Sequence, residues 1–103
     1  MSINIRTRGS VKGGVAEIKS LIRHPMESGA RMDQSTGKPF PMKLIQTVTV
    51  DVNGTRAVDA QWSANISTNP YMHVNVAAKS GDEITINVED NTGEKGSETF
   101  KLR

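Results

Sequence analysis

The stretch that decides the fold is MKLIQTVTVDVNGTRAVDAQW, residues 42–62. Apolar and polar residues alternate over 42–52 and again over 55–62, as expected for strands that bury one face. Between them stands Asn53–Gly54, the strongest short-range signal for a hairpin because both residue types tolerate a positive φ. Residues 42–52 and 55–62 are therefore predicted to form an antiparallel β-hairpin.

The pairing register of this hairpin follows from which face of each strand is apolar. A two-residue Asn–Gly loop pairs Val50 with Ala57 and puts the apolar residues of the two strands on opposite faces. A three-residue loop over 52–54, with its glycine in a left-handed bulge, pairs Val48 with Val58. Because a slip of one residue reverses the buried face of a strand, we expect the bulged hairpin.

Four further stretches have the length and the apolar pattern of strands: residues 14–24, 71–79, 83–90 and 97–103. The first of them also fits a helical stripe. The glycines before it, Pro25 after it and the strand-rich remainder of the chain favour a strand. The turns and connections between the strands are predicted over residues 63–70, 80–82 and 91–96.

Residues 25–41 contain three prolines and no sustained period, so we expect a long loop, with at most a short edge strand. Loops of this length in compact domains are usually functional or mobile. The chain therefore has six or seven short strands at roughly ten-residue spacing and no predicted helix. This pattern predicts one all-β domain over residues 1–103, an antiparallel immunoglobulin-like β-sandwich with an aliphatic core.

Composition excludes several classes of function. The 103 residues contain no cysteine, which excludes a thiolate metal site, an iron–sulfur cluster and a cysteine nucleophile on this chain. The net charge of +2 hides an asymmetry, since residues 1–43 carry 8 basic and 3 acidic side chains and residues 44–103 carry 5 and 8. This distribution favours oriented docking with a charged protein.

Membrane, secretion and nucleic-acid signals are weak. No stretch approaches the roughly 20 apolar residues of a membrane span, and the first residues lack the apolar region of a signal peptide, so we expect neither. The four aromatic residues do not cluster with the basic ones, which argues against nucleic-acid binding. We expect Arg6, Arg8 and Lys12 to form a solvated or partner-facing edge.

Signals for catalysis or metal binding are also weak. The chain lacks a Gly-x-Ser-x-Gly nucleophile motif. His24, Glu27 and Asp33 are close in sequence, but their spacing matches no zinc or calcium motif. We expect no cofactor and no catalytic residue. A small metal- or redox-linked enzyme that uses His24 and Glu27 remains an alternative.

The loop that begins at His24 carries residues suited to protein recognition. Met26, Met32 and Met42 would give an adaptable apolar contact surface, and Arg31 would be a good interface anchor. Alternatively, the methionines fold back onto the edge of the sandwich.

At this loop the sequence resembles a known family. Residues 18–33 read IKSLIRHPMESGARMD, and Asn69–Pro70–Tyr71 follows later. These two blocks resemble SoxZ, the cysteine-free subunit of the SoxYZ sulfur carrier of bacterial thiosulfate oxidation, and the resemblance runs along essentially the whole chain.

The resemblance implies a fold, a partner and a location. The fold is an immunoglobulin-like sandwich, and the heterodimer partner is SoxY, whose C-terminal glycine-rich arm carries the cysteine that holds the sulfur substrate. Other Sox enzymes make transient contacts, the location is periplasmic, and export relies on the partner's signal peptide. An isolated chain can also self-associate through unpaired strand edges.

We expect the two blocks to form partner-binding surface and not catalytic surface. The predicted binding residues are His24, Pro25, Met26, Glu27, Ser28, Gly29, Arg31, Asn69, Pro70 and Tyr71. The main alternative is a free-standing β-sandwich that acts as an adhesion or chaperone-like accessory module.

Overall fold

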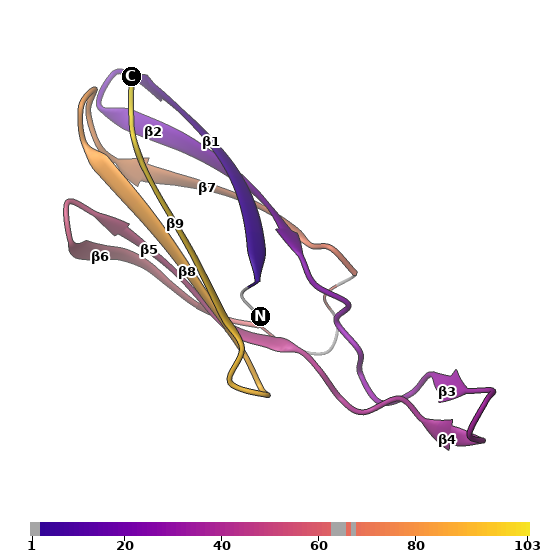
Figure 1. The fold of residues 1–103 in the computed structure, drawn as a ribbon. Coiled ribbons are helices and arrows are strands. Elements are labelled where there is room, and N and C mark those ends of the chain that lie inside the picture. Colours follow the sequence, from indigo (N-terminus) through magenta and orange to yellow (C-terminus); the bar gives the residue numbers. More distant parts are fainter. Residues whose placement is uncertain (1–2, 63–65, 67) are drawn as a thin grey trace.

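The protein is an antiparallel β-sandwich with a projecting arm (Figure 1). This computed structural model describes residues 3–62, 66 and 68–103. One sheet has the order β1-β2-β7, the other has the order β6-β5-β8-β9, and β3 and β4 pair by themselves. The strands are β1 (Asn4–Lys12), β2 (Val15–Arg23), β3 (Met32–Asp33), β4 (Lys38–Pro39), β5 (Ile45–Val52), β6 (Thr55–Gln61), β7 (Tyr71–Ala77), β8 (Glu83–Asp90) and β9 (Lys95–Lys101). The predicted immunoglobulin-like sandwich is confirmed.

The core lies between the two sheets and is aliphatic, as predicted. The alternation of inward apolar residues with outward polar ones, which a half-buried strand requires, is most regular in β8, where Ile84, Ile86 and Val88 point inward. The largest fully buried apolar side chains are Ile18, Ile22, Ile45, Val48, Val50, Ile84, Ile86 and Val88. Burial of one such side chain contributes roughly 1.5–3 kcal/mol to folding.

No helix long and apolar enough to span a membrane occurs in the described part of the chain.

The ambiguous stretch at 14–24 is a strand, since β2 lies in the middle of the three-stranded sheet. Its neighbour β1 was not predicted. Polar and glycine residues dilute the apolar pattern of β1, whose inward residues include Thr7 and Gly9. Arg6, Arg8 and Lys12 do lie on an edge strand, because β1 pairs only with β2 in this sheet.

The hairpin over 42–62 forms, but its predicted register is wrong. The loop is the two-residue Asn53–Gly54 turn, with φ of 51° and 82°. The bulge lies further along, where the pairing passes from Asp51↔Arg56 to Val50↔Val58. Val48 consequently pairs with Ala60 and not with Val58. Ala57 is the one extra residue in β6, and it returns the apolar residues of the two strands to the same face. The bulge predicted at the turn would have had the same effect.

Residues 25–41 form a projecting hairpin in place of the predicted loop (Figure 1). The bridge between Glu27 and Lys43 closes its base, and β3 pairs with β4 near its tip. We call residues 27–43 the arm. It lengthens the molecule, whose principal extents are 54 × 20 × 19 Å. The predicted connection over 63–70 falls partly outside the described residues.

Candidate partner-binding site

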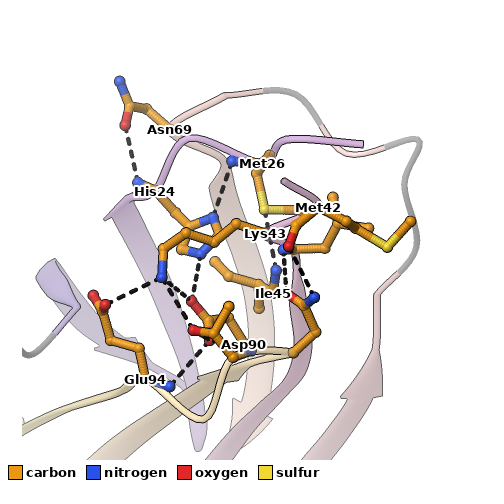
Figure 2. Close-up of polar contacts among 11 residues, drawn as sticks. His24, Met26, Met42, Lys43, Ile45, Asn69, Asp90 and Glu94 are labelled. Atoms are coloured by element: carbon orange, nitrogen blue, oxygen red, sulfur yellow. Dashed lines mark hydrogen bonds and ion pairs between the residues drawn. The ribbon is translucent and has the colours of Figure 1, made fainter. Parts of the chain in front are cut away.

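His24 marks the point where the chain leaves the sandwich for the arm. It follows β2 and is 3% exposed. Its Nε2 lies 3.0 Å from Oδ2 of Asp90, and its Nδ1 accepts the backbone N–H of Met26 at 3.0 Å (Figure 2). Because Nδ1 is an acceptor, the ring is the neutral tautomer that carries its proton on Nε2 and donates it to Asp90.

Asp90 joins three segments of the chain at this point. Its Oδ1 accepts the backbone N–H groups of Thr92 and Glu94 at 2.9 and 3.0 Å and the Thr92 hydroxyl at 2.6 Å, which shapes the β8–β9 turn. Its Oδ2 accepts His24 and also Lys43 Nζ, at 2.8 Å. Burial raises the pKa of Asp90, but the hydrogen bonds from Lys43, Thr92 and His24 outweigh it and hold the pKa well below its usual range. The carboxylate therefore stays ionised in the interior.

Lys43 anchors the returning strand of the arm. Its ammonium lies between Asp90 and Glu94, 2.8 and 3.1 Å from their carboxylate oxygens. The hydrogen bond to Asp90 is the main reason why the pKa of Lys43 is raised. Both ends of the arm are thus tied to one buried carboxylate, the outgoing end through His24 and the returning end through Lys43.

The three methionines near the arm do not share one role. Met26 is 7% exposed, and its sulfur lies 3.4 Å from the backbone N–H of Ile45 (Figure 2). It adopts a positive φ of 50°, which is unusual for its residue type. Met32 and Met42 are 52% and 53% exposed. Met26 therefore follows the alternative of packing back on the sandwich, whereas Met32 and Met42 present apolar surface.

The structure brings together the two sequence blocks that carry the family resemblance. Asn69 Oδ1 accepts the backbone N–H of His24 at 3.0 Å, and the Asn69 N–H donates to the His24 carbonyl at 2.8 Å. The Thr68 hydroxyl donates to the carbonyl of Pro25 at 3.0 Å. Asn69 has a positive φ of 49°, a conformation that asparagine tolerates better than most residues.

Tyr71 and Arg31 are both exposed, but their environments differ. Tyr71 begins β7, pairs with Leu21 and is 60% exposed. Arg31 lies within the arm, where Nε donates to Glu27 at 3.1 Å and the guanidinium stacks 4.0 Å from the centre of the Phe40 ring. Arg31 therefore stiffens the arm, and a partner can reach only the part of its side chain that these contacts leave open.

The ten predicted binding residues divide by exposure. Pro25, Arg31, Asn69 and Tyr71 are exposed, Glu27, Ser28 and Gly29 are half-buried, and His24, Met26 and Pro70 are buried. The exposed members can contact a partner directly. The buried members can affect binding only by shaping the surface that the exposed residues present. Their role in partner binding stays a prediction.

The geometry gives His24 no obvious chemical task. A histidine bonded to a carboxylate resembles the base of a hydrolytic triad, but a base needs a free nitrogen that faces substrate. Both nitrogens of His24 are occupied within the protein, and the Glu27 carboxylate is held by Arg31. Within the described residues no group of three or more His, Cys, Asp or Glu side chains could hold a metal ion.

Sequence reasoning missed Asp90 and Lys43. One signal was present, because Asp90 continues the inward series of Ile84, Ile86 and Val88. A carboxylate on the buried face of a strand needs a cation or several hydrogen-bond donors. Asn91, whose side chain bonds the backbone of Met42 and Leu44, gave no such signal.

Comparison with models of protein families matches residues 5–101 to "Sulphur oxidation protein SoxZ". Comparison with curated proteins finds no match. Similar solved structures include the superoxide reductase from Nanoarchaeum equitans, which is 15% identical with a TM-score of 0.62; the match covers 98% of this chain and 91% of that chain.

A second superoxide reductase, in the oxidized state, is 10% identical with a TM-score of 0.63, and the match covers 99% of this chain and 87% of that chain. At such low identity these two likenesses show the fold alone. The family match is different in kind, because it covers nearly the whole sequence. This chain therefore belongs to the SoxZ family of sulphur oxidation proteins.

Proposed function

We propose that this chain is the non-catalytic subunit of a sulfur-carrier complex and binds SoxY, whose C-terminal arm cysteine carries the sulfur substrate. One observation carries the proposal: a chain of the SoxZ family has no cysteine on which to carry sulfur itself. Its task is then to hold the partner and to help present the partner's arm to the enzymes of sulfur oxidation, through transient contacts.

The proposed recognition surface is the arm together with the exposed residues of the Asn69–Tyr71 block. The support for this surface is the way in which the arm is held. The arm projects from the sandwich, its two ends are tied to buried Asp90, and its Met32 and Met42 are half-exposed apolar side chains (Figure 1). A held arm loses less entropy on binding than a free loop, which favours affinity.

Mass spectrometry of the complex co-expressed with SoxY and supplied with thiosulfate tests the carrier role. The expected sulfur adduct lies on the SoxY cysteine, and this chain keeps its unmodified mass. An adduct on this chain, or failure of the two chains to co-purify, would refute the proposal.

Alanine substitution tests the recognition surface. We expect Met32→Ala with Tyr71→Ala to weaken the affinity for SoxY or the pathway turnover at least about 5-fold, because interface anchors contribute more than 1 kcal/mol each. The matched control is Thr55→Ala, which is also exposed but lies at the start of β6. Unchanged affinity and turnover in the double variant would place the recognition surface elsewhere.

We further propose that the complex works in the periplasm and that this chain is exported with its partner. Cell fractionation with and without the SoxY signal peptide tests this: the chain should stay in the cytoplasm when that peptide is removed. In the absence of SoxY, self-association is expected along the unpaired edges of β6 and β7.

A further inference from the structure

The outer face of the three-stranded sheet is rich in basic side chains. The register places residues of β1, β2 and β7 side by side on this face: Arg6 opposite Leu21, and Leu21 opposite Tyr71. The same alternation brings five cationic side chains onto it, and we call this surface the basic face. They are Arg6, Arg8, Lys12, Lys19 and Arg23.

Carboxylates neutralise little of this charge. Glu17 is the one acidic residue in the three strands, and its two oxygens lie 3.2 Å from Lys19 and 3.3 Å from His73. Within the described residues, the other four cations of the basic face make no ion pair. Bringing them together costs repulsion unless a counter-charge covers them.

The outer face of the four-stranded sheet is the internal comparison. There four acidic residues accompany three basic ones, Arg56, Lys95 and Lys101, and two of the three cations make a local ion pair. Asp51 bonds Arg56 at 2.7 Å, and Glu89 lies 3.3 Å from Lys95. An excess of positive charge is thus found on the outer face of the three-stranded sheet and not on that of the four-stranded sheet.

Apolar side chains accompany the cations. Five large hydrophobic residues are exposed among those described, and two of these, Met32 and Met42, lie on the arm or at its base. The other three all lie on the basic face: Val15, Leu21 and Tyr71. Leu21 and Tyr71 help to line a depression of about 390 Å³ together with Arg6, Arg8 and Lys19.

We propose that the basic face is a second interaction surface, which docks an acidic surface of a protein partner. Cations set around an apolar centre are the pattern of protein interfaces, where charge steers the encounter and the buried apolar contact supplies affinity. Nucleic acid would need a series of stacking aromatic residues, and Tyr71 is the one aromatic residue in these three strands. This surface goes beyond the recognition surface proposed above, although Tyr71 borders both.

Charge reversal with a matched control tests the inference. The test pair is Arg6→Glu with Arg8→Glu, two exposed cations on edge strand β1. The control pair is Lys95→Glu with Lys101→Glu, two exposed cations on edge strand β9 of the other sheet. Surface plasmon resonance measures binding to SoxY and, with the assembled heterodimer, to each purified enzyme of the same oxidation system, at 50 and 300 mM salt.

For at least one of these proteins, the test pair should weaken binding 10-fold or more. The control pair should change it less than 2-fold, and higher salt should weaken wild-type binding. Equal effects of the two pairs with every protein would overturn the proposal. So would tighter binding to a 20-nucleotide single strand or to phosphatidylglycerol vesicles than to any protein.

Two readouts separate this inference from the proposed function. Loss of SoxY binding in Met32→Ala alone, which lies on the arm and outside the basic face, with an intact effect of Arg6→Gln with Arg8→Gln on another enzyme, supports two surfaces. The glutamine pair removes the positive charge without adding a repulsive negative charge. Thermal unfolding confirms that the glutamine pair and the glutamate pair at Arg6 and Arg8 both fold. No effect of the glutamine pair on any partner, beside an intact carrier complex, would overturn the basic face alone.

Discussion

Asp90 is the single side chain on which the arm, strand β2 and the β8–β9 turn all depend. Replacing it with asparagine removes the charge opposite Lys43 and puts an amide against the Nε2–H of His24. We expect Asp90→Asn to lower the free energy of unfolding by about 3 kcal/mol, because it breaks a buried ion pair. Urea unfolding at pH 7 measures the loss.

The control is Asp59→Asn on the exposed side of β6, which should stay within about 0.5 kcal/mol of wild type. A loss below 1 kcal/mol in Asp90→Asn would mean that Lys43 and His24 find other partners at little cost.

The same carboxylate predicts a pH dependence. The pKa of Asp90 is held well below its usual range in the folded protein, whereas in the unfolded chain it is about 3.9. The ionised group therefore stabilises the fold above about pH 4, and this contribution is lost as the pH falls, because the unfolded chain takes up the proton first.

Urea unfolding at steps from pH 5 to pH 2 should give a steeper fall in stability for wild type than for Asp90→Asn. Other lowered carboxylates, such as Asp33 and Asp82, remain in both proteins and cancel in the comparison. Parallel curves for the two proteins would contradict the prediction.

At this scale the sequence predicted only part of the site. It singled out His24 and Asn69 because they lie in blocks that resemble a family. It could not show that they bond each other, since 45 residues separate them, or that His24 reaches Asp90, 66 residues away. The alternation of apolar and polar residues along one strand carries no information about such long-range contacts, which depend on how the two sheets stack.

At the scale of elements, the turn at Asn53 tests how a short signal positions two strands. Asn53 holds a positive φ of 51°; its side chain donates to Asp82 at 3.0 Å and accepts the N–H of Glu83 at 2.9 Å. Asn53→Ala loses both bonds and forces alanine into the left-handed region. We expect a cost of about 2–3 kcal/mol in the free energy of unfolding.

Asn53→Gly is the matched variant, since glycine accepts the positive φ but cannot make the two side-chain bonds. It should cost about 1 kcal/mol less than Asn53→Ala. If the glycine variant is no more stable than the alanine variant, the positive φ costs alanine nothing at this turn, and the two side-chain bonds that both variants lose account for the whole effect.

Strands were predicted best where the apolar alternation is dense. β8 was predicted with its observed bounds, because three β-branched inward residues leave no other reading. β1 was missed because Thr7 and Gly9 stand at inward positions. The predicted position of the bulge in the β5–β6 hairpin was wrong. The apolar pattern requires one extra residue in the hairpin so that both strands bury the same face, but it does not say which residue is the extra one.

At the scale of the whole molecule, the charge asymmetry read along the chain becomes an asymmetry between sheets. The basic N-terminal part supplies β1, β2 and the arm, and the acidic part supplies the four-stranded sheet. β7 is the one strand that crosses back, and it contains no Lys, Arg, Asp or Glu. The partition of charge therefore survives folding, and the outer faces of the two sheets have different electrostatic potentials.

The two sheets also meet along one side, where β1 passes close to β9. The backbone N–H of Ile3 donates to the carbonyl of Lys95 at 2.9 Å. A Cβ on Gly96 would overlap the carbonyl oxygen of Ile3 and lie 2.8 Å from its Cβ, so only glycine fits there. Because the obstacle is backbone, we expect Gly96→Ala to open this side and to cost about 3 kcal/mol of unfolding free energy.

Gly9→Ala is the control, since its Cβ would also come within 3 Å of its neighbours, Leu102 and Phe100. Those atoms are the ends of side chains, which can rotate away, so the expected cost is about 1 kcal/mol. Urea unfolding compares the two variants, and hydrogen exchange should show faster exchange of the Ile3 amide in Gly96→Ala. An equal cost for both would mean that β1 shifts as easily as a side chain and does not lock the sandwich.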